Sequence, residues 1–298
     1  AIELKSVFAI AHYNLGNVLR DQGKLREAEI VTRKSIELSP DSLIFHFSLG
    51  YLYQSLGEYE KSNCVFKNIL RLKNINDQTK LGSLGQLYLN SLLEGNFQLF
   101  DQLIYDAKKL DIKDNFFGKD NFVIKLGSGL KAEEQLSNYK NVTHIGDSHC
   151  MAFSHQSLIL NSMKRKIIPL YIRGAKAWHF ANKEMNIWKS SLAEQINNQN
   201  NSTEVLISFG EIDCRKDEGI LPFSIKYNKE IFEVCKKTIN GYLNYMETSL
   251  SLFFPKRYYF GIPAPTQKKE FFDALDVRRI ELIQNYNYLL KREVLSRG

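Results

Sequence analysis

The chain lacks any long hydrophobic segment, and this absence limits where it can work. Its apolar runs fall far short of the about 18 residues that a membrane-spanning helix needs. The opening residues, Ala1-Ile2-Glu3-Leu4-Lys5, do not resemble the apolar core of a signal peptide. We therefore expect a cytoplasmic protein without a membrane span.

Cysteine is scarce and shows no pattern of its own. The four cysteines have neither the spacing of metal ligands nor that of a tight disulfide framework: Cys64, Cys150, Cys214 and Cys235. Reduced thiols are the default for a chain without a secretion signal. We expect no metal and no cofactor.

Charge of either sign is moderate. Lys and Arg number 40 against 33 Asp and Glu, which gives a net charge of +7. The lysines are spread along the chain, which favours a solvated basic surface over a nucleic-acid site. A length of 298 residues with 44% hydrophobic and 24% charged residues is typical of one large or two ordinary globular domains.

The first third of the chain contains an internal repeat. Leu15-Gly16 recurs as Leu49-Gly50, 34 positions later, and Gly23 recurs as Gly57. Small residues at Gly16 and Gly50 would let two helices approach closely, and Gly23 and Gly57 sit where a turn needs a permissive backbone. The period and pattern resemble the tetratricopeptide repeat. A third, looser copy begins near Leu84-Gly85.

This resemblance predicts helical repeats over residues 1–110. It implies a surface that binds a protein or peptide partner. Because residues 1–5 match residues 35–39, the end of the first full copy, we expect the chain to be a fragment of a longer protein.

The remainder alternates strand and helix patterns. We predict strands at 143–145, 166–172, 205–209 and 257–263, and helices at 150–162, 182–197, 227–254 and 268–295. Such alternation indicates a parallel sheet with helices on both faces. The predicted division is therefore a repeat region at 1–110, a connector at 111–138 and an α/β domain at 139–298.

Two short motifs each close a predicted strand of this domain: Gly146-Asp147-Ser148-His149 and Gly210-Glu211-Ile212-Asp213. The carboxyl ends of parallel strands share one edge, where open α/β folds place their chemistry. The order of the motifs resembles the SGNH (GDSL-like) hydrolase superfamily. The resemblance implies a flavodoxin-like, three-layer α/β fold in which Ser148 is the nucleophile. It also matches Gly174 to a glycine whose backbone N–H helps hold the oxyanion. Asp213 matches the last residue of the family's Gly-x-Asn-Asp motif.

The chain departs from that family at two places. Ile212 stands where the family has an oxyanion-binding asparagine, and losing such a donor costs about 100- to 1000-fold in turnover. All six histidines precede the second motif, so the late Asp-x-x-His that supplies the base is missing: His12, His46, His144, His149, His155 and His179. Either the base lies beyond Gly298 or the domain has lost hydrolysis.

Further residues at the same edge are predicted to contact the substrate: Asp147, His149, Arg173, Glu211 and Arg215. Arg215 would bind a carboxylate or phosphate on a ligand or replace the lost asparagine near the oxyanion, or else form an internal salt bridge that braces the loop. Asp147 would chiefly accept hydrogen bonds that hold the serine turn. His144 and His179 are interpreted as packing or rim residues. His149 adjoins Ser148, so its side chain is expected to point away from that serine, and His155 is too far from Ser148 to act as its base.

Two functions follow from these observations. The first is a serine esterase or acyl hydrolase that acts on a small ester, for example an O-acylated glycan, and uses its repeats to bind a protein. The alternative is a non-catalytic binding or scaffold protein with a degenerate SGNH-like domain. The intact Gly146-Asp147-Ser148 favours the first function and Ile212 the second.

Overall fold

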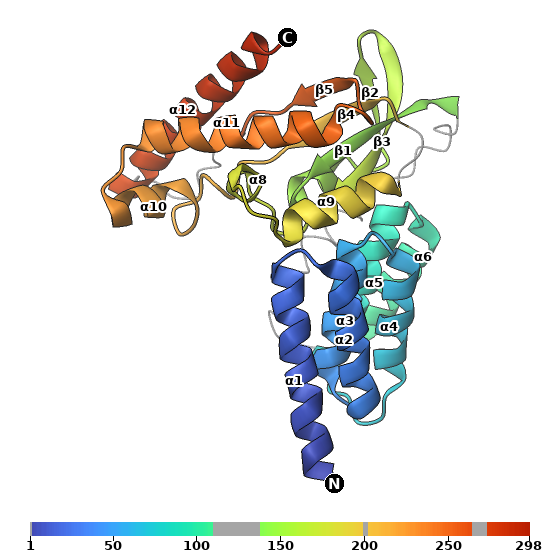
Figure 1. The fold of residues 1–298 in the computed structure, drawn as a ribbon. Coiled ribbons are helices and arrows are strands. Elements are labelled where there is room, and N and C mark those ends of the chain that lie inside the picture. Colours follow the sequence, from blue (N-terminus) through green and yellow to red (C-terminus); the bar gives the residue numbers. More distant parts are fainter. Residues whose placement is uncertain (1, 110–137, 199–201, 264–272) are drawn as a thin grey trace.

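The computed structural model describes residues 2–109, 138–198, 202–263 and 273–298. The first range folds into successive helical hairpins (Figure 1). Their helices are α1 (Ile2–Asp21), α2 (Leu25–Leu38), α3 (Leu43–Ser55), α4 (Tyr59–Arg71), α5 (Asp77–Glu94) and α6 (Phe97–Lys109). The predicted helical repeat array is confirmed, and the third hairpin, α5 with α6, is the looser copy.

The small residues of the repeat lie where helices touch. A Cβ atom added at Gly50 would lie 2.5 Å from Cζ of Phe66, and one added at Gly16 would lie 2.7 Å from Oγ1 of Thr32. The Ser62 hydroxyl donates to the carbonyl of Gly50 at 3.0 Å. The two helices of the first two hairpins therefore pack too closely for any larger residue at these glycines.

The second part of the chain builds a five-stranded sheet in the order β2-β3-β1-β4-β5. Its strands are β1 (Lys140–Gly146), β2 (Ser157–Leu160), β3 (Met163–Tyr171), β4 (Glu204–Ser208) and β5 (Lys256–Tyr259). β3, β1, β4 and β5 run parallel, whereas β2 pairs antiparallel with β3. The sheet is mixed and curled (Figure 1), not the wholly parallel sheet that the sequence predicted.

The difference arises in the predicted helix at 150–162, which was wrong. A short 3-10 helix, η2 (Ser148–Phe153), is followed directly by β2. Asn161 and Ser162 have φ angles of 49° and 62°, and they link the paired residues Leu160 and Met163. A two-residue turn with both φ angles positive is the favoured hairpin connection, so this segment folds back as an edge strand.

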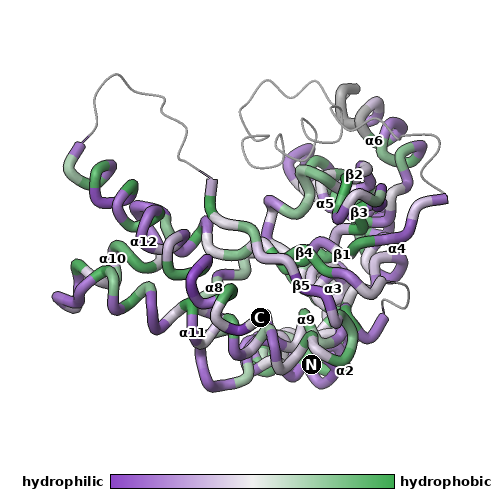
Figure 2. Tube along the Cα trace, turned by 90° about the horizontal axis from the view of Figure 1, so that it is seen from above, coloured by the Kyte–Doolittle hydropathy of each residue, from purple (hydrophilic) through white to green (hydrophobic). Residues whose placement is uncertain are grey.

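The sheet packs against helices from the rest of the chain. These are α8 (Ala177–Ala181), α9 (Ile187–Asn197), α10 (Ile220–Tyr227), α11 (Ile231–Leu250) and α12 (Ala274–Ser296). Ile145, Val205 and Ile207 point into their shared core, beside Leu243 and Tyr286. Viewed from above, α10, α11 and α12 gather on the side of the sheet away from α4, α5 and α6 (Figure 2).

Strand side chains alternate, so Val142 and Leu206 take the opposite face of the sheet and form a separate small cluster with Ile167. Most of the predicted connector at 111–138 lies outside the described residues, and the domain boundaries stay a prediction. Within the described ranges, no helix has the length and apolar character that a membrane crossing requires.

The repeat array contacts the sheet domain through its hairpin turns. Gly23, Gly57 and Gly95 adopt positive φ angles of 78°, 72° and 71° at these turns. A Cβ atom added at Gly23 would meet the Ser190 hydroxyl at 2.4 Å, and one added at Gly95 would meet the His155 ring at 2.8 Å. These turns, in addition to needing a left-handed backbone, form the surface on which the second domain rests.

Polar contacts strengthen this junction. The Arg26 guanidinium pairs with Glu194 of α9 at 2.8 Å, and the Ser191 hydroxyl donates to the Ser55 carbonyl at 2.7 Å. The Nε2 atom of His155 lies 2.9 Å from the Leu92 carbonyl oxygen. His155 therefore belongs to the junction with α5 and takes no part in the edge where Ser148 lies.

Candidate functional site

The sequence motifs meet at the carboxyl edge of the parallel strands. β1 ends at Gly146, and Gly146 pairs with Tyr171 of β3 and with Ser208 of β4. The segments that follow these three strands carry the predicted site residues. A Cβ atom at Gly146 would lie 2.5 Å from the Ser208 hydroxyl, so the first motif needs a glycine where it passes β4.

Asp147 organises the turn that holds Ser148. Its side chain is 1% exposed, and Oδ1 accepts a hydrogen bond from the backbone N–H of His149 at 2.9 Å. The carboxylate thereby caps η2, and Ser148 becomes the first residue of that helix. The structure therefore has Asp147 acting as the hydrogen-bond acceptor that the sequence suggested.

Ser148 is half-buried, and its hydroxyl makes no hydrogen bond within the described residues. Among these residues, no imidazole makes a hydrogen bond with it. Gly174 follows β3 with a φ angle of 63°, and the space beside its Cα is open. The backbone at Gly174 is thus accessible to a ligand.

His149 forms the most chemically suggestive contact at this edge. Its Nδ1 atom lies 2.8 Å from Oδ1 of the buried Asp147, and its side chain is 43% exposed. The hydrogen bond to Asp147 raises the pKa of His149 above its usual value, although partial burial opposes the rise. With Nδ1 as donor, Nε2 is left as an acceptor, the arrangement that a general base requires.

Asp213 lies entirely inside the protein. Its two carboxylate oxygens accept hydrogen bonds from the backbone N–H groups of Ala177, at 2.7 Å, and Trp178, at 3.0 Å. Burial raises the pKa of Asp213 to about 6, although these two donors favour the ionised form. Asp213 thus ties the loop after β4 to α8, and a catalytic part for it stays a prediction.

Ile212 is 7% exposed and brings no hydrogen-bond donor to the edge. Neighbouring Glu211 accepts from Arg215 at 2.8 Å and from Arg279 at 3.3 Å, and Arg215 also pairs with Glu218 at 3.1 Å. The internal salt bridge, one of the roles considered for Arg215, is therefore present. Contact of Glu211 or Arg215 with a ligand remains a prediction.

A cavity of about 370 Å³ opens beside His149 and Glu211. Its lining is mainly apolar and includes Ala152, Phe153, Phe209, Phe260, Ile262 and Pro263. Ser148 is not among the lining residues. An apolar chamber next to a polar edge is suited to an acyl group or another small apolar moiety.

His144 and Ser208 also line this cavity. The Nε2 atom of His144 lies 2.9 Å from the Ser208 hydroxyl oxygen, and its ring contacts those of Phe153 and Phe260. Burial lowers the pKa of His144 to about 4, so the ring is neutral at pH 7 and a poor base. The packing role expected for His144 agrees with this position.

Ser208 and the phenylalanines were missed by the sequence reasoning. The available signal for Ser208 was its position near the end of the predicted strand at 205–209, just before the second motif. The described residues contain no cluster of three or more histidine, cysteine, aspartate or glutamate side chains that could hold a metal ion.

Comparison with known proteins bears on the repeats alone. The tetratricopeptide repeat family matches residues 9–42, which cover most of α1 and all of α2. This match supports the repeat assignment, and repeats of this kind suggest protein–protein interaction. No curated protein matches the chain.

Proposed function

We propose that the sheet edge hydrolyses a carboxylic ester, with the acyl group in the cavity that His149 lines, and that the repeats bind a protein partner. The observation that carries this proposal is the Asp147–His149 pair. A buried carboxylate holds one imidazole nitrogen at 2.8 Å, and the same imidazole borders a mainly apolar cavity. The SGNH-like order of motifs and a flavodoxin-like arrangement of strands belong to the same proposal.

Ser148 is the proposed nucleophile. Its hydroxyl attacks the ester carbonyl while His149 accepts the hydroxyl proton through one intervening water, since no direct hydrogen bond joins the two described side chains. The backbone N–H groups of Ser148 and Gly174 stabilise the oxyanion. The alcohol leaves with a proton from His149, and water then releases the acyl group from Ser148.

A missing hydrogen-bond donor lowers the expected rate. Ile212 supplies no donor to the oxyanion, so we expect turnover about 100- to 1000-fold below that of an enzyme with the full set of donors. Short-chain acyl esters are the proposed substrates because the cavity holds about 370 Å³.

The test compares Ser148 with a serine outside the site. Hydrolysis of p-nitrophenyl acetate and butyrate is measured for the unmodified chain, for Ser148→Ala and for Ser251→Ala at the exposed end of α11, which is the matched control. Ser148→Ala should abolish turnover, because losing a nucleophile costs several orders of magnitude. Ser251→Ala should keep most of it. A fluorophosphonate probe should label Ser148.

Full turnover by a folded Ser148→Ala variant would refute the nucleophile assignment. If the unmodified chain is inert towards esters, including acetylated sugars, the non-catalytic binding function replaces this one. That alternative is favoured by the internal engagement of Asp213, whose two oxygens are both used by backbone donors.

A further inference from the structure

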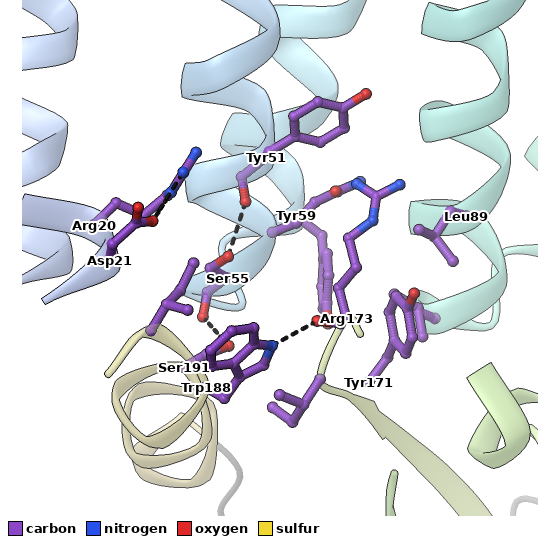
Figure 3. Close-up of a pocket in the computed structure, with 14 residues that line it drawn as sticks. Arg20, Asp21, Tyr51, Ser55, Tyr59, Leu89, Tyr171, Arg173, Trp188 and Ser191 are labelled. Atoms are coloured by element: carbon purple, nitrogen blue, oxygen red, sulfur yellow. Dashed lines mark hydrogen bonds and ion pairs between the residues drawn. The ribbon is translucent and has the colours of Figure 1, made fainter. Parts of the chain in front are cut away.

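A second cavity lies where the repeat array meets the sheet domain (Figure 3). It measures about 300 Å³ and is distinct from the chamber beside His149. The array contributes Tyr51 and Gln54 from α3 and Tyr59 from α4, and the second domain contributes Tyr171, Arg173 and Trp188. The site exists only because the two parts of the chain pack together.

Arg173 supplies a cation that no described carboxylate neutralises. Its guanidinium lies 4.6 Å from the centre of the Tyr51 ring, and Figure 3 shows it reaching from the sheet domain towards the array. Arg20, at the rim of the same cavity, is already paired with Asp21 at 2.9 Å. A ligand carboxylate would therefore find its partner in Arg173, whose planar fork suits that group.

Gln54 supplies an acceptor that needs a donor. The side chain is 9% exposed, and its Nε2 atom donates to the Asn90 side chain at 2.8 Å and to Gln86 at 3.3 Å. Its Oε1 atom is buried and has no hydrogen-bond partner among the described residues. A buried acceptor left without a partner raises the free energy of the protein. A ligand hydroxyl that donates to this oxygen would remove that penalty and so strengthen binding.

Trp188 supplies a fixed aromatic surface. Its ring stacks on that of His179, with centroids 3.3 Å apart, and its indole N–H donates to the Arg173 carbonyl at 3.1 Å. The second contact is drawn in Figure 3. Because the Trp188 side chain is held on two sides, a ligand ring can pack against it without the entropy cost of ordering that side chain.

We propose that this cavity binds an acidic sugar, which is a hydroxylated ring that carries a carboxylate. The carboxylate pairs with Arg173, a hydroxyl donates to Gln54 Oε1, and the ring packs among the aromatic side chains. The volume is at the lower limit of small-ligand sites and suits one ring better than an extended peptide. Arg173 directly precedes Gly174, so the sugar would lie close to the edge in the proposed function. Only this connection between the sugar and the sheet edge rests on the proposed ester hydrolysis.

The experiment measures binding of sodium glucuronate to the whole chain. Trp178→Phe leaves Trp188 as the sole tryptophan, so its fluorescence reports directly on the cavity, and calorimetry gives the affinity. Arg173→Gln should weaken binding about 10- to 100-fold, as expected for a lost charge-assisted hydrogen bond. The control is Arg292→Gln on α12, where the arginine pairs with Glu293, and it should leave the affinity unchanged.

Glucose and N-acetyl-aspartate amide complete the design, because the first lacks the carboxylate and the second lacks the sugar ring. We expect both to bind at least tenfold more weakly than glucuronate. Equal binding of glucose, or unchanged affinity in a folded Arg173→Gln variant, would overturn the proposal. So would tighter binding of the aspartate derivative, which would indicate an acidic peptide. No ester is involved, so a failed hydrolysis assay leaves this result untouched.

Discussion

Replacing Asp213 by asparagine should remove a large pH dependence from the stability of this protein. The Asp213 carboxyl group is fully buried, and its only described donors are two backbone N–H groups of α8. Burial penalises the charged form more than these donors favour it, so the pKa rises from 3.8 to about 6. Asparagine has nearly the same shape and no titration.

The magnitude follows from that pKa difference. A shift of about two units corresponds to about 3 kcal/mol in the free energy of unfolding. Since the folded pKa lies above the unfolded value, the folded protein binds the extra proton. This contribution is fully present below pH 3.8 and is lost as the pH rises through about 6. The asparagine variant also loses one hydrogen-bond acceptor. This loss lowers its free energy of unfolding by a further amount of about 1–3 kcal/mol that does not depend on pH.

Urea unfolding at several pH values between 4 and 7 measures the effect. Groups common to both proteins cancel in the difference between the unmodified chain and Asp213→Asn. We expect that difference to fall with rising pH and to become constant above about pH 6. Asp273→Asn is the control, because hydrogen bonds lower the pKa of that helix-capping carboxyl below its usual 3.8, so its difference should stay nearly constant between pH 4 and 7. A flat or rising difference for Asp213→Asn would refute the reasoning.

Three other substitutions test the packing and the proposed base. Gly50→Ala should lower the free energy of unfolding by about 1–3 kcal/mol in thermal or urea unfolding, because the new methyl group would meet Phe66 at 2.5 Å. Gly82→Ala, where the nearest atom lies 3.6 Å away, should instead stabilise α5 by up to about 1 kcal/mol, and equal effects would contradict both expectations. Asp147→Asn should lower the pKa of His149, because the Asp147 hydrogen bond is the main cause of its rise. An NMR titration of His149 checks this, and an unchanged midpoint would show that the pair is not coupled.

The repeats could be predicted because their pattern is local. Close packing within a hairpin requires small residues at a fixed spacing, so Gly16 and Gly50 mark the register directly in the sequence. The positive φ angles of Gly23 and Gly57 are likewise properties of individual turns. Four of the five strands were also predicted, because buried strands have continuous apolar runs.

The segment after Ser148 shows where local reasoning fails. Ser157-Leu158-Ile159-Leu160 is a short apolar run, and such a run suits a helix and a strand equally well. The turn at Asn161 and Ser162, together with the open edge of β3, selects the strand. Pairing with a partner strand therefore decided the structure of this segment.

The sequence alone determined the helical register, the positions of four of the five strands along the chain and the placement of Ser148, Gly174 and Asp213 after strand ends. Only the tertiary structure decided what each of these residues touches. Asp213 faces α8, and His144 meets Ser208 across 64 positions of sequence. The junction cavity likewise joins Gln54 to Arg173. Periodicity specifies which face of an element is buried, whereas contacts between distant residues depend on how whole elements pack.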